Sequence, residues 1–265
     1  MESSTKSHCT EEANCCGPLK AESGHLVVKD DEKACLMNTY FASVGEKLAL
    51  DLPPSITRLL SSDLVTQTKI VPSLSQVNLS EVGVLRQIKH LKSNKATGPD
   101  GISPILLKLA SHAVSPHLTS LFRRSIHHET AYEGWKLARV SPIFKKDDST
   151  DPGNYRPISI LSVPSKLPES EINTAIVNHA TNNNLITPNQ WAYRKAHSTE
   201  LLLIHLTEKL RKFVDDGLTV AVAFVDFRKA FDSVLHSRLL DKLHGQFGID
   251  GELYAWMDSY LSNRK

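Results

Sequence analysis

The sequence has no uninterrupted apolar stretch long enough to cross a bilayer, and its N-terminus has no signal-peptide core. It also lacks the Gly-Lys-Ser/Thr closure of a phosphate-binding P-loop and the Gly-x-Ser-x-Gly elbow of α/β-hydrolases. These absences exclude P-loop and serine-hydrolase chemistry of those kinds. We expect a nuclear or cytoplasmic protein.

Cysteine is scarce, and its four copies are confined to the first 35 residues, at Cys9, Cys15, Cys16 and Cys35. Together with His8 they form a candidate zinc-binding cluster. The spacing lacks the Cys-x-x-Cys geometry of common zinc modules, which argues against a metal site. We interpret them as reduced thiols, with zinc binding as the less favoured alternative.

The net charge of +2 conceals an uneven distribution along the chain. Residues 1–50 carry 5 Lys and Arg against 8 Asp and Glu, whereas residues 51–150 carry 13 against 8. A basic region that follows an acidic one is compatible with a polyanionic partner, although charge alone is weak support.

The pattern of the first 79 residues predicts a leader followed by a helical segment. Residues 1–33 are polar and without period, which predicts disorder. Residues 34–79 are expected to hold one amphipathic helix and then a connector broken by two adjacent prolines. The helix is predicted from apolar residues at helical spacing, namely Leu36, Tyr40, Phe41, Val44 and Leu48.

Residues 80–189 have helical and extended patterns in turn. Ser80 is placed to cap a helix, and the "ATGPDG" stretch has the composition of a turn. Two further helices are predicted at about 104–110 and 116–128. The stretch from Trp135 to Leu161 reads as two extended segments joined by a polar, charged loop.

Residues 190–265 contain the clearest helical pattern of the chain. Leu203, Leu206, Leu210 and Phe213 share a helix face, and Gly217 is placed to end that helix. A buried strand over residues 218–227 and a helix at about 236–244 are expected next. Because the elements do not alternate regularly, the pattern favours an α+β fold over a doubly wound sheet.

Three groups of residues are candidates for chemistry. Asp226 ends the apolar run "VAVAFVD", where a strand end offers a hard oxygen ligand on a rigid element. Its alternative is an ordinary turn or capping aspartate. Lys145, Lys146 and Arg156 flank the charged loop and suit a triphosphate. Their alternative is a solvated hairpin.

The third group is the stretch "NQWAYRKAHST", which begins at Asn189. Aromatic, basic and amide side chains alternate there, as suits the bases and phosphates of a nucleic acid. In the alternative interpretation Trp191 and Tyr193 pack in the core, and Ser198 or Thr199 caps the following helix.

Five blocks in this order resemble one family: "NKATGPDGISPILLK", "WKLARVSPIFKKDD", "NYRPISILSVPSKLPE", "NQWAYRKAHST" and "FVDFRKAFDSVLHSRLLDKL". Together they resemble the reverse transcriptase of non-LTR (LINE-type) retrotransposons, over residues 80–265. The preceding "ACLMNTYFASVGEKL" is similar to the segment between endonuclease and reverse transcriptase in such polyproteins.

The resemblance implies an RNA-directed DNA polymerase with a right-hand fold, with fingers at 80–189 and the start of the palm at 190–265. It implies RNA template, DNA primer and dNTPs as partners and Mg²⁺ as cofactor. Asp226 and the carbonyl of Phe227 match metal ligands, and Phe231 matches the residue that excludes the ribose 2′-hydroxyl. Asp232 is a regular part of the same family block, and we expect it to have a structural role, hydrogen-bonding near the turn.

The same resemblance assigns nucleotide binding to several side chains. Lys145 or Lys146, and Arg156, match fingers residues that hold the incoming triphosphate. Gln190 and Arg194 match a block close to the template and the nascent pair.

The sequence also departs from the family pattern. Neither the Gly-x-Pro-Gln-Gly block nor the Tyr-x-Asp-Asp block occurs in these 265 residues, so we expect a C-terminally truncated domain that does not polymerise. Ala192 stands where the family usually has glycine, and Pro168 falls where a helix is expected. The alternatives are a non-catalytic nucleic-acid-binding remnant and a decayed retrotransposon fragment.

Overall fold

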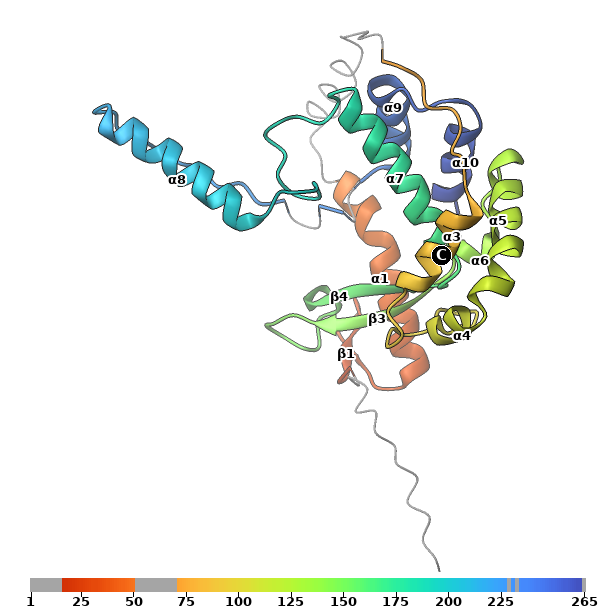
Figure 1. Ribbon diagram of the computed structural model, residues 1–265. Coiled ribbons are helices and arrows are strands. Elements are labelled where there is room, and N and C mark those ends of the chain that lie inside the picture. Colours follow the sequence, from red (N-terminus) through yellow and green to blue (C-terminus); the bar gives the residue numbers. More distant parts are fainter. Residues whose placement is uncertain (1–15, 51–70, 228–229, 232–233, 264–265) are drawn as a thin grey trace, which may run out of the picture.

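A computed structural model of the chain describes residues 16–50, 71–227, 230–231 and 234–263, with side chains 44–50 outside the description. Helices and strands are mixed, as the α+β prediction requires (Figure 1). The described strands form two antiparallel two-stranded sheets, β1–β2 and β3–β4. No helix of the described part is both long and apolar enough to span a membrane.

The elements follow one another from an N-terminal hairpin to a C-terminal helix pair. They are β1 (Leu19–Lys20), β2 (Leu26–Val27), α1 (Asp30–Leu50), α3 (Glu81–His90), α4 (Pro104–Leu109), α5 (Ser111–His127), α6 (Glu133–Lys136), β3 (Ala138–Phe144), the 3-10 turn η1 (Pro152–Asn154), β4 (Tyr155–Leu161), α7 (Lys166–Asn182), α8 (Thr199–Asp215), α9 (His236–Phe247) and α10 (Gly251–Leu261).

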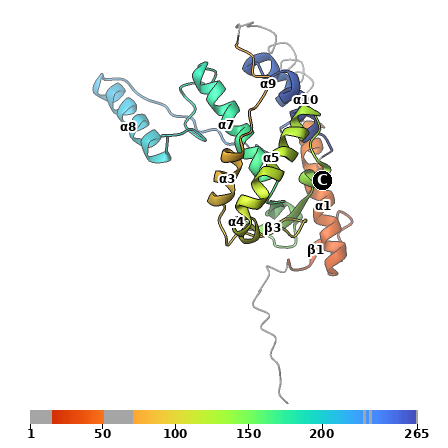
Figure 2. The same ribbon diagram turned by 45° about the vertical axis from the view of Figure 1, so that its right-hand side comes forward.

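The main core lies where α3, α5, α7 and α10 meet, and Figure 2 shows α3, α5 and α7 grouped with α10 at one side of the molecule. Ser80 caps α3 as predicted, because its Oγ accepts a hydrogen bond from the Gly83 N–H at 3.0 Å. The buried side chains of this core include Val84, Ile88, Phe122 and Leu253. Burial of such side chains is the main favourable contribution to folding, at about 1.5–3 kcal/mol each.

The helix pair α9 and α10 is part of this same core. Ile249 is fully buried, and its backbone pairs with that of Leu74 in an isolated parallel bridge. The Trp256 indole donates a hydrogen bond to Ser125 Oγ at 2.9 Å, and the Tyr260 hydroxyl donates to Glu169 at 2.6 Å. Residues near 250 are therefore tied to residues far earlier in the chain, 91 positions away for Tyr260 with Glu169 and 131 for Trp256 with Ser125.

A second, smaller core lies at the N-terminal end of the described chain. The β1–β2 hairpin and α1 bring Leu19 and Met37 against Tyr155 of β4. Residues 16–33 are thus ordered, in contrast to the disorder that composition predicted for 1–33. The reason is a long-range contact, because a distant hairpin covers apolar side chains too few to form a core by themselves. Cys9 and Cys15 lie outside the described residues, so the zinc alternative does too.

Two prolines lie inside helices, at positions with different consequences. Pro168 is the third residue of α7, where the backbone N–H would have no partner within the helix, so the predicted cost of an interior proline does not arise. Pro116 lies well inside α5, which begins at Ser111 rather than at the predicted 116. Because proline has no backbone N–H, the helix gives up one backbone hydrogen bond there.

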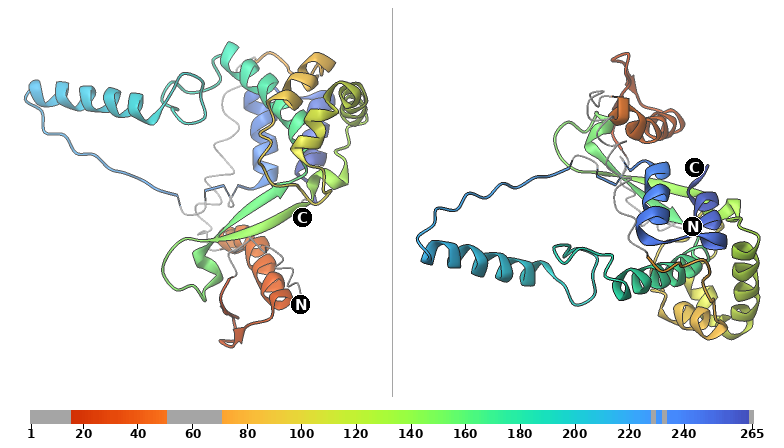
Figure 3. Two further views of the ribbon diagram at one scale, coloured as in Figure 1. Left: turned by 60° about the horizontal axis from the view of Figure 1, so that its bottom comes forward. Right: turned by 90° about the horizontal axis from the view of Figure 1, so that it is seen from above.

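The predicted helix before Gly217 is confirmed as α8, which extends away from the main core (Figures 1 and 3). Ser198 caps it through a 3.2 Å hydrogen bond from the Leu201 N–H. None of its residues is buried, and Leu203 and Ile204 are 56% and 60% exposed. The periodicity therefore predicted the helix, although its apolar side chains are at most half-buried.

The "ATGPDG" turn is packed against the end of β4. Asp100 accepts a 2.6 Å hydrogen bond from the Ser162 hydroxyl, and its other oxygen accepts one from the Ile102 N–H. Gly98 approaches the backbone so closely that a Cβ there would lie 2.5 Å from both N and Cα of Ser162. A glycine is therefore required for the approach of two backbones.

We predict that Gly98→Ala destabilises the fold by about 1–3 kcal/mol, because backbone atoms cannot yield as a flexible side chain can. The matched control is Gly245→Ala in α9, where nothing lies within 4 Å of an added Cβ. The control should stabilise by roughly 0.5–1 kcal/mol, because alanine favours a helix interior. Urea unfolding measures both, and equal midpoints for the two variants would contradict the packing of this turn.

Candidate nucleotide and nucleic-acid site

The β3–β4 hairpin confirms the two predicted extended segments and determines which of their side chains share a face. Its register pairs Ile143 with Arg156 and Phe144 with Tyr155, and the Lys145 N–H donates to the Asn154 carbonyl at 2.9 Å. Directly opposed residues lie on the same face, and alternate residues along a strand do too. Lys145 and Arg156 therefore share one face of the hairpin.

Both of these side chains are exposed, and Lys146 follows in the bend beyond β3. No ion pair within the described part of the chain involves Lys145, Lys146 or Arg156. The structure thus brings two of the three predicted cations together on one open surface. Such a pair can bind phosphate, Arg156 through a planar fork and Lys145 as a point charge.

The acidic residues of the same loop are used within the loop. Asp148 accepts hydrogen bonds from the Thr150 N–H at 2.9 Å and from its hydroxyl at 2.8 Å. These bonds, the backbone one first, hold the pKa of the Asp148 carboxyl below its ordinary value. Asp151 accepts from the Gly153 N–H at 2.7 Å. The carboxylates therefore shape the turn and leave the cations beside it without a described ion pair.

The opposite face of the hairpin is backed by the N-terminal residues. Tyr155 is 4% exposed, and its ring packs with Leu19 and Met37. Its hydroxyl donates to the Ser149 carbonyl at 2.7 Å. Burial raises the pKa of the Tyr155 hydroxyl, and the neighbouring Cys16 thiol raises it further.

Residues 189–198 of this block form an irregular loop before α8, which begins at Thr199. The Arg194 guanidinium donates to the Thr187 and Gln190 carbonyls at 3.3 and 3.2 Å, and the Gln190 amide donates to the Ala192 carbonyl at 3.3 Å. In this structure both predicted template-side residues hold their own loop together. Ala192, which replaces the family's glycine, does not adopt a positive φ.

The positive φ values in this loop occur at other residues, Tyr193 (59°) and Ala196 (60°). Neither is glycine, so both positions carry backbone strain. The Trp191 ring contacts the rings of His197 and His205, with ring centroids 5.1 and 5.5 Å apart. Tyr193 is 85% exposed, so the alternative that placed it in the core is wrong.

Residues 218–227 do not form the predicted buried strand. They run extended from the end of α8 back towards the body of the molecule, without strand pairing, and all but Val220 are exposed (Figure 3). Within the described residues β1 pairs with β2 and β3 with β4, and residues 218–227 pair with none of these strands. An apolar strand needs neighbours at both edges and cover on both faces, and neither is present within this described part of the chain.

Asp226 and Phe227 lie at the end of this segment, exposed to solvent. Phe231 follows, and its ring meets that of Tyr193 edge to face, with centroids 6.3 Å apart. The block around residue 193 and the block around residue 231 thus lie side by side, although Tyr193 and Phe231 are far apart in the sequence. Asp232 lies outside the described residues.

The donors at this position do not complete a metal centre. Asp226 offers a carboxylate and Phe227 a carbonyl oxygen, whereas a magnesium pair requires several carboxylates to offset its charge. Within the described residues no group of three or more His, Cys, Asp or Glu side chains is placed to hold a metal ion.

The structure adds Arg139, a cation that the sequence reasoning missed. It lies in β3 on the same face as Lys145, six residues earlier, is exposed, and donates to the Thr97 carbonyl at 3.3 Å. The sequence could have predicted this position. Alternate residues of a strand share a face, so residues 143, 141 and Arg139 lie on the same face as Lys145. The cationic face of the hairpin therefore comprises Arg139, Lys145 and Arg156.

Comparison with known proteins identifies the class. Residues 143–265 match the family described as reverse transcriptase (RNA-dependent DNA polymerase). The match begins within β3 and includes the hairpin loop, the 189–199 block and the segment that ends at Asp226. The chain thus carries sequence of a reverse transcriptase domain, a family of metal-dependent polymerases.

Three similar proteins all belong to one kind of reverse transcriptase. The chain is 25% identical over 249 residues to a probable RNA-directed DNA polymerase from transposon BS of Drosophila melanogaster, covering 94% of this chain and 27% of the relative. It is 27% identical over 213 residues to the RNA-directed DNA polymerase from mobile element jockey of the same species, with 80% and 23% covered.

A third relative is the Pol polyprotein from type-1 retrotransposable element R1 of Bradysia coprophila, 27% identical over 241 residues, with 87% of this chain and 21% of the relative covered. The domain is therefore that of non-LTR retrotransposons, which confirms the resemblance drawn from the five blocks. The chain spans about a quarter of the length of these relatives.

We predict that alkaline pH weakens the second core through Tyr155. Its folded-state pKa is raised, so its contribution to stability is complete below the unfolded value of about 10 and is lost as the pH rises through the folded value. Tyr155→Phe should lose this pH dependence and also the hydrogen bond to Ser149, at a cost of about 1 kcal/mol at neutral pH. Unfolding at a series of pH values tests this, and parallel alkaline profiles for the two proteins would refute it.

Proposed function

We propose that this chain supplies the fingers and the first palm block of an RNA-directed DNA polymerase, with the cationic face of the β3–β4 hairpin binding the triphosphate of the incoming dNTP. The observation that carries the proposal is the shared, exposed face of Lys145 and Arg156. In this assignment the fingers comprise residues 80–189 and the palm begins at residue 190.

The Tyr193–Phe231 contact supports the second half of the assignment. Phe231 would meet the sugar of the incoming nucleotide and exclude a ribose 2′-hydroxyl, while Gln190 and Arg194, four residues apart in the adjoining loop, would lie beside the template base. RNA template and DNA primer would be held through backbone and shape, which suits a basic surface without sequence readout.

Asp226 and the Phe227 carbonyl would be the contribution of this chain to a Mg²⁺ site. The metal would activate the primer 3′-oxygen and neutralise the leaving pyrophosphate. Because the sequence contains no Tyr-x-Asp-Asp block, we propose that these 265 residues bind nucleotide and nucleic acid but do not extend a primer alone. The alternative is a non-catalytic nucleic-acid-binding remnant that uses only the basic surface.

Nucleotide binding separates these two functions. We predict that Lys145→Ala and Arg156→Ala each weaken binding of dATP with Mg²⁺ by roughly tenfold or more, since a hydrogen bond to a charged group is worth about 1.5–3 kcal/mol. The control is Lys242→Ala, which removes an exposed cation from α9 and should leave binding unchanged. Isothermal titration provides the affinities.

Equal loss in all three variants would reduce the effect to net charge and remove the assigned site. Salt-dependent RNA binding without any nucleotide binding would favour the nucleic-acid-binding remnant. Primer extension by the unmodified chain, abolished by Asp226→Ala, would contradict the proposal that further carboxylates are needed.

A further inference from the structure

The N-terminal residues 16–43 are packed onto the hairpin that carries Lys145 and Arg156. We call this segment the brace; it comprises the β1–β2 hairpin and the first part of α1. Its side chains Leu19 and Met37 are 0% and 5% exposed, and they share a core with Tyr155 at 4%. Leu36 and Phe41 of α1 are partly buried against this core, which joins the brace to β4 through Tyr155.

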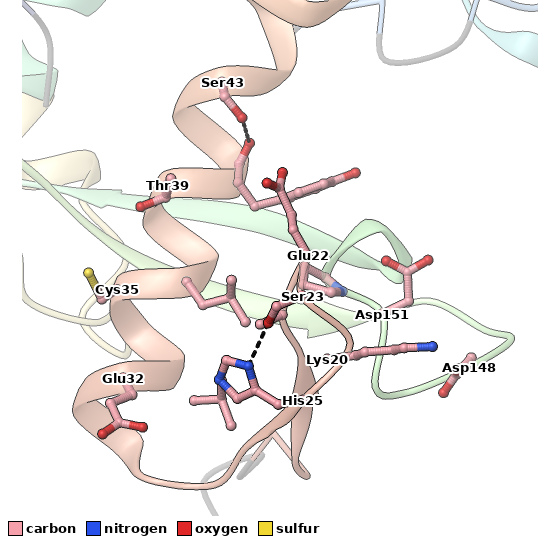
Figure 4. A pocket seen from close by; sticks show the side chains of 15 residues that line it. Lys20, Glu22, Ser23, His25, Glu32, Cys35, Thr39, Ser43, Asp148 and Asp151 are labelled. Atoms are coloured by element: carbon pink, nitrogen blue, oxygen red, sulfur yellow. Dashed lines mark hydrogen bonds between the residues drawn. The ribbon is translucent and has the colours of Figure 1, made fainter.

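The brace also contacts the loop between β3 and β4 directly. The Lys20 N–H donates to the Thr150 carbonyl at 2.8 Å. A Cβ added to Gly153 would lie 3.0 Å from the Tyr40 hydroxyl, so α1 reaches the 3-10 turn η1 at van der Waals distance. Figure 4 shows side chains of the hairpin, of α1 and of the loop lining one hollow, with Lys20, Asp148 and Asp151 on the loop side.

The other hydrogen bonds of the loop join residues of the β3–β4 hairpin itself. Its hydrogen bonds from Thr150 to Asp148 and from Gly153 to Asp151 lie at exposed positions, where water competes for the same groups. Asp147 adopts a positive φ of 73°, a conformation that costs a non-glycine residue free energy. The burial of Tyr155 and the hydrogen bond from Lys20 to Thr150 therefore restrain the loop before a nucleotide binds.

A flexible cation binds phosphate less tightly than one whose backbone is already positioned, because the ordering cost falls on the binding step. Lys145 is one residue from the Phe144–Tyr155 pair, and the ring centroids of that pair are 5.4 Å apart. The brace contacts Tyr155 on the face opposite to Lys145 and Arg156, so it can fix the hairpin without touching a nucleotide.

We infer that the brace is a positioning element for nucleotide binding: residues 16–43 hold the loop of residues 145–154 in place and thereby set the affinity of Lys145 and Arg156 for a triphosphate. The inference rests on the proposed function for the nucleotide. The restraint of the loop by the brace is a structural claim that can be tested without one.

Two leucines of the brace give a matched pair of variants. Leu19 is 0% exposed in the second core, and Leu26 is 56% exposed in the same hairpin. Leu19→Ala should open the loop, and limited trypsin digestion of the full chain should then cleave after Lys145 and Lys146 at least about tenfold faster. Leu26→Ala should be cleaved at the unmodified rate. Circular dichroism monitors the helical core in both variants.

A second pair tests the backbone contact. Lys20→Ala removes a side chain but keeps the N–H, whereas Lys20→Pro removes the donor to Thr150. Only the proline variant should accelerate cleavage in the loop. Wild-type cleavage rates in Leu19→Ala and Lys20→Pro, with the helical signal retained, would overturn the brace.

The nucleotide arm uses dATP with Mg²⁺ as the probe. Leu19→Ala should weaken binding several-fold while Leu26→Ala does not. If Lys145→Ala and Arg156→Ala reduce binding but Leu19→Ala does not, the positioning role is wrong and the proposed function stands. If neither cation matters and loop cleavage still responds to Leu19→Ala, the proposed function fails and the brace remains as a structural element only.

Discussion

The register of the β3–β4 hairpin is the constraint on which the site depends. Because side chains alternate along a strand, the pairing of Ile143 with Arg156 determines at once that Arg156 and Lys145 face one side and Tyr155 the other. A slip of β4 by one residue would exchange the two faces of that strand. Arg156 would then meet the brace on the face opposite Lys145, and the tyrosine ring would meet solvent. Packing of Tyr155 against Leu19 therefore fixes the register that exposes the cations.

The apolar segment of residues 218–227 shows the opposite case. Its sequence is that of a buried strand, but the described residues provide neither a pairing strand nor a layer that covers it. Phe224 and Phe227 are 87% and 75% exposed, and the adjoining α8 exposes its own leucines. Such side chains are typical of a strand covered on both faces. The segment leads to Asp226 and Phe231, so the residues proposed for catalysis are exposed to solvent.

Local patterns predicted most of the elements. The caps at Ser80 and Ser198, the helix before Gly217 and the paired extended segments all follow from rules that operate over a few residues. The failures arise from contacts distant in sequence. Residues 16–33 are ordered because Tyr155 covers them, and the 218–227 strand fails because no neighbour pairs with it. For the site, the resemblance to the family pointed to Lys145 and Arg156 as candidates for binding the triphosphate. Only the register of the β3–β4 hairpin showed that Arg139 lies on the same face.

The central claim is that nucleotide meets one face of the hairpin while the brace occupies the other. Chemical acetylation of lysines, quantified by mass spectrometry with and without dATP and Mg²⁺, tests it on the unmodified chain. Lys145 is exposed on the proposed nucleotide face, whereas the side chain of Lys33 in the brace is 13% exposed and pairs with Asp30. The account predicts that dATP protects Lys145 and leaves the low reactivity of Lys33 unchanged. Equal reactivity of Lys145 with and without dATP at saturating concentration would contradict it.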